Sequence, residues 1–132
     1  MIFAHTLESV LKGTKSQTRR LIKAGEWLSA DGTSILTASG RRLYQVGKTY
    51  AVQAGRGKRA VARIRITGLR RERVGAISME DAHAEGFPSS QMFLAAWRAI
   101  HGLNADLLAE VWVISFYIEP RANLHSKHQR GR

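Results

Sequence analysis

The segment from residue 13 to residue 20, Gly-Thr-Lys-Ser-Gln-Thr-Arg-Arg, concentrates three cations, several hydroxyls and an amide directly after an apolar helical stretch. A threonine hydroxyl is a weak nucleophile unless a base removes its proton. A lysine can be that base if burial or neighbouring positive charge lowers its pKa. Lys15, Thr18 and the adjacent Arg19 and Arg20 therefore form a set that can activate a hydroxyl and stabilise an anion. We predict that Lys15 and Thr18 are catalytic and that Gln17, Arg19 and Arg20 contact the ligand.

A second polar feature lies at Glu85. Ser78 is a typical N-cap and is followed by carboxylates in a first helical turn, and Gly86 is placed to end that helix. Glu85 then lies at the carboxyl end, where the helix dipole disfavours a negative charge unless a cation is close by. We expect Glu85 to face Lys15 across a cleft, where it orients the lysine or protonates a leaving group. The alternative is a solvated glutamate on a frayed turn.

A third group of candidates lies on a basic strand. Residues 60–67 alternate, so that Arg63 and Arg65 share the face opposite Ile64 and Ile66. Lys58 lies at the tip of the preceding turn, whose two glycines are too close together for a Walker phosphate-binding loop. We predict that Lys58, Arg63 and Arg65 contact phosphates; the alternative is a solvated strand face.

The scaffold for these residues reads as one α+β domain with a curved or closed sheet. We interpret the polar segment as a loop at a helix exit, and the apolar stripe of the last helix (Phe93, Ala96, Trp97 and Ile100) as core. The other expected elements are a strand over 1–5, a helix from Thr6 to Gly13, a hairpin around residues 31–32, strands over 49–53 and 60–67, helices over 78–86 and 88–102, and a central strand over 111–118.

Composition indicates the class of partner. The 132 residues fit one domain, predicted over 1–119 with a basic, disordered tail over 120–132. Twenty-one lysines and arginines against ten acids leave a charge of +11, which favours nucleic acid as the partner. The chain has no cysteine, which excludes thiolate metal sites, and its five histidines lack ligand spacing. We expect a cytoplasmic protein with no membrane segment, no metal site and no cofactor, although a nuclease activity could use a divalent metal.

Several short motifs, taken in order, resemble the ASCH domain family. They run from Met1 to about Ile118, nearly the whole predicted domain. The motifs are Gly13-x-Lys15-x-x-Thr18-x-Arg20, Val46-Gly47-Lys48-Thr49-Tyr50, Ala82-x-Ala84-Glu85-Gly86-Phe87, Phe93-x-x-x-Trp97 and Glu110-Val111-Trp112-Val113-Ile114.

The resemblance implies a PUA-like β-barrel with helices at its openings and an association with RNA. Some small ASCH members remove acyl groups from the N4 amine of cytidine nucleosides with a Lys, a Thr and a Glu, which correspond here to Lys15, Thr18 and Glu85. Others are ribonucleases. For strand cleavage our own hypothesis is that Lys15 stays protonated and binds the phosphate while Glu85 or a histidine, His83 or His101 by residue type, moves protons. We predict an RNA-binding, ribonuclease-like domain with a hydrolytic cleft. The alternatives are an N4-acylcytidine amidohydrolase and a non-catalytic RNA-binding module.

Overall fold

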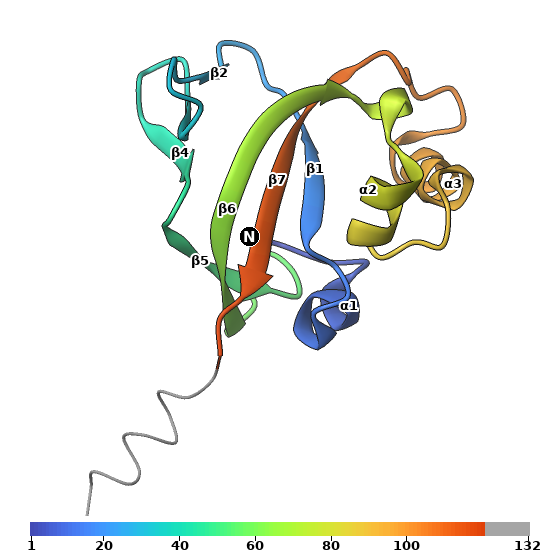
Figure 1. The fold of residues 1–132 in the computed structure, drawn as a ribbon, viewed down its shortest axis with the longest axis horizontal. Helices are drawn as coiled ribbons and strands as arrows, with labels where there is room; N and C mark the ends of the chain where they lie inside the picture. Colours follow the sequence, from blue (N-terminus) through green and yellow to red (C-terminus); the bar gives the residue numbers. More distant parts are fainter. Residues whose placement is uncertain (121–132) are drawn as a thin grey trace, which may run out of the picture.

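A strongly curled antiparallel sheet forms the body of the molecule (Figure 1). The computed structural model describes residues 1–120, so the predicted tail lies, apart from Pro120, outside the described residues. The sheet order is β1-β7-β6-β5, with a smaller sheet β2-β3-β4 beside it. The strands are β1 (Gln17–Leu21), β2 (Trp27–Leu28), β3 (Ser34–Leu36), β4 (Arg42–Gln45), β5 (Thr49–Gln53), β6 (Ala60–Arg73) and β7 (Glu110–Ile118). The predicted α+β class with a curved sheet is confirmed.

The strand β7 lies at the centre of the main sheet, between β1 and β6. Five of its nine residues are buried, as expected for a strand that is covered on both faces. The long strand β6 continues past Thr67, where we expected it to end, because a register shift between Ile66 and Gly68 lets it bend and stay paired with β7 as far as Arg73.

Three α-helices flank the curled sheet. They are α1 (Leu7–Lys12), α2 (Met79–Ala84) and α3 (Ser90–His101), and a short 3-10 helix, η1 (Val74–Ala76), follows β6. In the view of Figure 1, α2 and α3 lie together on one side of the sheet and α1 lies below β1. Gly13 ends α1 with a φ of 79°, a conformation that favours glycine. The hydroxyls of Ser78 and Ser89 cap α2 and α3 by accepting from Asp81 and Met92 backbone N–H groups. Within residues 1–120, no helix has the length and apolar character needed to span a bilayer.

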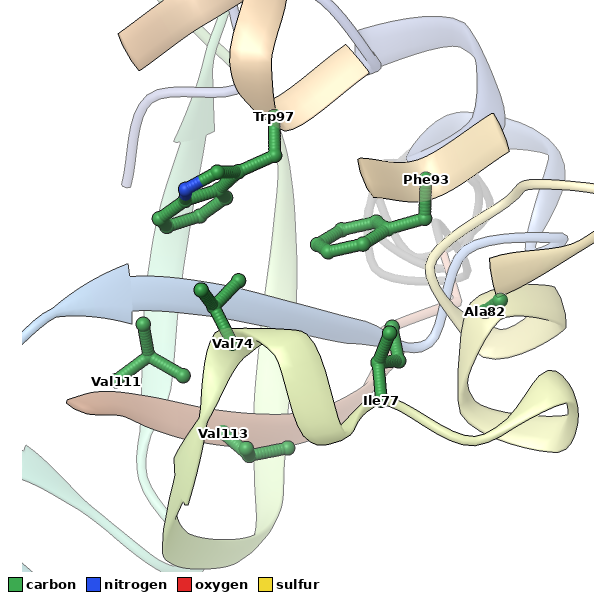
Figure 2. Packing of buried hydrophobic residues seen from close by; sticks show 7 residues of the cluster. All are labelled: Val74, Ile77, Ala82, Phe93, Trp97, Val111 and Val113. Atoms are coloured by element: carbon green, nitrogen blue, oxygen red, sulfur yellow. The ribbon is translucent and has the colours of Figure 1, made fainter. Parts of the chain in front are cut away.

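The core that supports the site lies between α2, α3 and one face of β7 (Figure 2). Phe93 and Trp97 project from α3 toward Val111 and Val113 of β7. The alternate residues Trp112 and Ile114 pack on the other face, against Ile35 of β3. The central strand therefore joins both layers. The other members of the first cluster are Val74, Ile77 and Ala82.

Besides the length of β6, two further sequence predictions differ from the structure. The first residues form only an isolated parallel bridge, Ile2 to Gln53, and not a strand. The polar segment is not a loop beyond Ser16, because residues 17–21 form β1 and pair with the free edge of β7. Polarity concealed this strand, since its side chains face charged partners and a cavity in place of an apolar core.

Candidate active site

Lys15 and Glu85 form a buried ion pair, although 70 positions separate them in the chain. Lys15 Nζ lies 2.5 Å from Glu85 Oε1 and 3.4 Å from the Glu85 carbonyl oxygen. Both side chains are less than 5% exposed. The backbone holds them together, since Ser16 N–H donates to the Ala84 carbonyl at 2.6 Å and Phe116 N–H donates to the Ser16 carbonyl at 2.9 Å. The structure thus brings the predicted lysine to the end of α2 where Glu85 lies.

Arg19 fixes the other oxygen of the same carboxylate. Its Nη1 donates to Glu85 Oε2 at 3.1 Å and to Gln17 Oε1 at 2.9 Å. Its Nε and Nη2 donate to Glu72, and Nη2 also donates to Asp81. These five bonds match the five N–H donors of a guanidinium, and the side chain has no exposed area. A direct contact between Arg19 and a ligand, which we predicted, would require one of these bonds to break. The geometry gives Arg19 a positioning role.

Thr18 and Arg20 lie on β1 beside this pair. Arg20 Nε donates to Thr18 Oγ1 at 3.3 Å, and Arg20 Nη2 donates to the Ile2 carbonyl at 2.7 Å. The guanidinium carbon lies 5.2 Å from the centre of the Phe3 ring, which favours a cation over its face. Thr18 is 5% exposed. A cation therefore lies next to the hydroxyl that we predicted to be a nucleophile.

One cavity of about 420 Å³ collects these groups. Lys15, Thr18, Arg20 and Glu85 line its polar part. The rest of the wall is largely aromatic or apolar and includes Phe3, Phe87, Phe93, Trp97 and Ile100, together with His5 and His101. A concave site with an apolar wall and a few convergent polar groups is typical of small-molecule binding.

Burial lowers the pKa of the Lys15 ammonium from its ordinary value, and the nearby Arg20 and Arg19 lower it further. Glu85 acts in the opposite direction, but desolvation is the largest effect and the net change is a lowering. A lysine of this kind can serve as a base more readily than an exposed one. Within residues 1–120, Nζ donates to Glu85 and not to Thr18. Proton transfer between Lys15 and Thr18 would therefore need a bridging water or a ligand atom.

Four other residues that we predicted to contact the ligand lie outside this cavity. Gln17 joins the network below it, donating to Asp81 and accepting from Arg19. Arg63 donates to Thr49, and Arg65 pairs with Glu119 at 2.6 Å. Lys58 is exposed in the turn between β5 and β6. The predicted alternation of β6 is present, because Ile64 and Ile66 are buried while Arg63 is exposed. Phosphate binding by Lys58, Arg63 and Arg65 stays a prediction.

Sequence reasoning missed the aromatic wall and the supporting acids. We interpreted the α3 stripe as core, but Phe93 and Trp97 both pack in the core and line the cavity, and Ile100 is 52% exposed. The spacing of this stripe predicts one helical face and cannot separate core from cavity. Glu72 and Asp81, which hold Arg19, gave no signal because their partner lies more than 50 positions away. Of the two histidines that we considered, His101 lines the cavity, while His83 bonds to the Pro88 carbonyl.

No metal-binding cluster accompanies these groups in the described part of the chain, since residues 1–120 contain no group of three or more His, Asp or Glu side chains able to hold an ion. The buried carboxylates are instead engaged by Lys15 and Arg19.

Comparison with solved structures identifies the fold. The ASCH domain from Lactobacillus crispatus JV V101 matches with a TM-score of 0.61 and 21% identity, over 85% of this chain and 69% of that one. Protein EF3133 from Enterococcus faecalis V583, of family DUF984, matches with a TM-score of 0.57 and 18% identity, over 85% and 68% of the two chains. No family model and no curated protein matches the sequence.

The chain therefore has the fold of an ASCH domain, as the sequence motifs predicted. At this level of identity the likeness defines the fold alone. The chemical function of the site depends on its own residues.

Proposed function

We propose that this protein is an RNA-directed hydrolase whose cavity takes one nucleoside unit and hydrolyses a bond in it with Lys15, Thr18 and Glu85. The observation that carries the proposal is the buried Lys15–Glu85 pair in the same cavity as Thr18 and Arg20. Burying two charges is costly unless they are well paired, so a purely structural role is better served by apolar residues. The charge of +11 favours an anionic polymer as the larger ligand.

The bond that fits this geometry best is an amide to an exocyclic amine of the base, as in N4-acylcytidine. Thr18 Oγ attacks the acyl carbon, and Lys15 accepts the hydroxyl proton through a bridging water. Arg20, which already donates to Thr18 Oγ1, stabilises the oxyanion. The oxyanion then collapses and expels the base amine, which takes a proton from Lys15. Water hydrolyses the acyl ester on Thr18 and releases a carboxylic acid.

Glu85 holds Lys15 in place throughout, and Arg19 holds Glu85. This arrangement fits the role in which Glu85 orients the base.

A second candidate is strand cleavage, and His101 is the observation that favours it. Its ring lines the cavity and lies 4.0 Å, centre to centre, from the Trp97 ring. A protonated Lys15 would then bind the phosphate, and His101 would remove the proton from the ribose 2′-hydroxyl. In this scheme Thr18 has no covalent role.

The test is to incubate N4-acetylcytidine and, separately, end-labelled single-stranded RNA with the wild-type protein and with Lys15→Ala. We expect release of acetate and cytidine by the wild type and its loss in Lys15→Ala. RNA shortening that depends on His101 would instead establish the ribonuclease. If the wild type binds RNA but converts neither substrate, the domain is a binding module and the hydrolytic proposal is wrong.

A further inference from the structure

A second cavity adjoins the first. It has a volume of about 640 Å³ and extends from β1 toward the turn between β3 and β4. Arg20, Trp97 and His101 are among the residues that line both cavities, so the two meet at these side chains. None of the steps described above uses this second space.

The second cavity is lined by cations that form no salt bridge within the described residues. Arg20, Lys23 and Arg41 line it, and within residues 1–120 no carboxylate forms a salt bridge with any of them. Other arginines on the same sheet differ in this respect, because Arg65 pairs with Glu119 and Arg71 pairs with Glu110. Three cations around one hollow favour an anionic ligand.

The Glu26 carboxylate, which also lines this cavity, already accepts two hydrogen bonds. Glu26 Oε1 accepts from Trp112 Nε1 at 3.0 Å and from the Lys23 backbone N–H at 2.9 Å. Glu26 therefore fixes the chain that carries Lys23. It leaves the Lys23 ammonium available for a ligand, because its contact is with the backbone.

Flat apolar surface lies beside these cations. Tyr44 lines the cavity, with its ring edge against Tyr50 at 5.8 Å between centres. Burial raises the pKa of the Tyr44 phenol above its ordinary value, so the hydroxyl stays protonated at neutral pH. A neutral aromatic ring beside unpaired cations is the combination with which proteins bind the bases and phosphates of single-stranded nucleic acid.

From this juxtaposition we infer that the second cavity binds the nucleotide next to the one held in the first cavity. The bridging phosphodiester lies where the two spaces meet, the next phosphate lies between Lys23 and Arg41, and the base lies against Tyr44. The inference rests on the proposed function for the content of the first cavity. It makes the preferred ligand an oligonucleotide of at least two units and not a free nucleoside.

The experiment compares two charge-matched double variants. Lys23→Ala/Arg41→Ala removes two cations from the second cavity. Lys12→Ala/Lys48→Ala removes two exposed lysines that line neither cavity. Binding of a fluorescently labelled cytidine tetranucleotide is measured by anisotropy over a series of salt concentrations. Turnover of N4-acetylcytidine is measured in parallel with the same proteins and with Lys15→Ala.

We expect Lys23→Ala/Arg41→Ala to bind the tetranucleotide about tenfold more weakly than the control variant. The slope of log Kd against log salt should fall by about 1.4, which is roughly 0.7 for each lost phosphate contact on a single strand. Turnover of the free nucleoside should be unchanged. Equal tetranucleotide affinity and equal salt slope in the two double variants would overturn the inference.

The two proposals fail in different ways. If the wild type does not convert N4-acetylcytidine but tetranucleotide binding still depends on Lys23 and Arg41, the hydrolytic proposal fails and the second subsite stands. If nucleoside turnover depends on Lys15 while tetranucleotide affinity is unchanged by Lys23→Ala/Arg41→Ala, the hydrolytic proposal stands and only the inferred second subsite is wrong.

Discussion

At the scale of single residues, the site depends on one lysine whose charge is costly to bury. Lys15 is held by one oxygen of Glu85, and Arg19 holds the other oxygen. The carboxylate therefore balances two cations while every N–H of Arg19 is used. Such a network sets the direction of Lys15 Nζ, while Thr18 and Arg20 line the cavity outside it.

The lowered pKa of Lys15 predicts the shape of the pH profile. A base acts when it is deprotonated, so kcat/KM for N4-acetylcytidine should rise with pH through a pKa below the ordinary lysine value of 10.5. Lys15→Arg keeps the charge but cannot be deprotonated. We expect this variant to lose roughly 10²–10⁴-fold in kcat/KM and to lose the rising limb. If kcat/KM of Lys15→Arg still rose with pH as in the wild type, a group other than Lys15 would be responsible for the rise.

The ion pair also predicts a coupling in stability. Glu85→Gln leaves the buried Lys15 ammonium without its carboxylate, which costs about 3–5 kcal/mol of unfolding free energy. Lys15→Met should cost less, because Glu85 keeps its ion pair with Arg19. The double variant Lys15→Met/Glu85→Gln should be more stable than the sum of the two losses predicts. Urea unfolding of the four proteins measures this coupling. Strict additivity would mean that the two groups do not interact.

At the scale of elements, the site forms at the junction between α1 and β1, beside the carboxyl end of α2. Glu85 is the C-cap residue of α2 and precedes Gly86, whose φ is 93°. A Cβ at Gly86 would lie 3.5 Å from Ser9 Cβ and 3.7 Å from Lys15 Cβ. The turn therefore packs directly on the backbone that carries the lysine.

Gly86→Ala should strain this turn. An alanine in the left-handed region costs roughly 1–2 kcal/mol, and the displaced turn should also lower kcat/KM by moving Glu85. Gly55→Ala is the matched control, since Gly55 does not have a positive φ and its nearest neighbour is a flexible Lys58 side chain at 3.6 Å. Denaturant unfolding compares the two. If Gly86→Ala matched the control in stability and activity, the turn would not position the site.

Sequence patterns predicted the elements whose ends or burial are marked by residues close together in the chain. The cap at Ser78 and the glycine ends of α1 and α2 were visible, and so was the apolar run of β7. The strand β1 was not visible, because its partner β7 lies about 95 positions later and its side chains are polar. The sequence indicated that Lys15 and Glu85 should meet, because Glu85 lies at a helix end that calls for a cation and because both residues belong to the ASCH-like motifs. No such signal marked Glu72 and Asp81 as partners of Arg19.

At the scale of the whole molecule, the cavities and the net charge predict two different responses to salt. RNA held through its phosphates should bind more weakly as salt rises. The slope of log Kd against log salt should be about 0.7 for each contacted phosphate on a single strand. A neutral nucleoside releases no counterions, so its turnover should be nearly independent of salt. Anisotropy titrations and nucleoside assays over the same salt series check this difference. RNA affinity that is insensitive to salt would contradict the electrostatic part of the account.

The central claim is that Thr18 is a nucleophile in a cavity shaped by the Lys15–Glu85 pair, and replacing its hydroxyl tests this most directly. Thr18→Val keeps the shape of the side chain and removes the oxygen, while Thr14→Val makes the same change at an exposed threonine. The measurement is the initial rate of cytidine release from N4-acetylcytidine by the two variants and the wild type. We predict background hydrolysis by Thr18→Val and wild-type hydrolysis by Thr14→Val. Wild-type hydrolysis by a folded Thr18→Val protein would contradict the account.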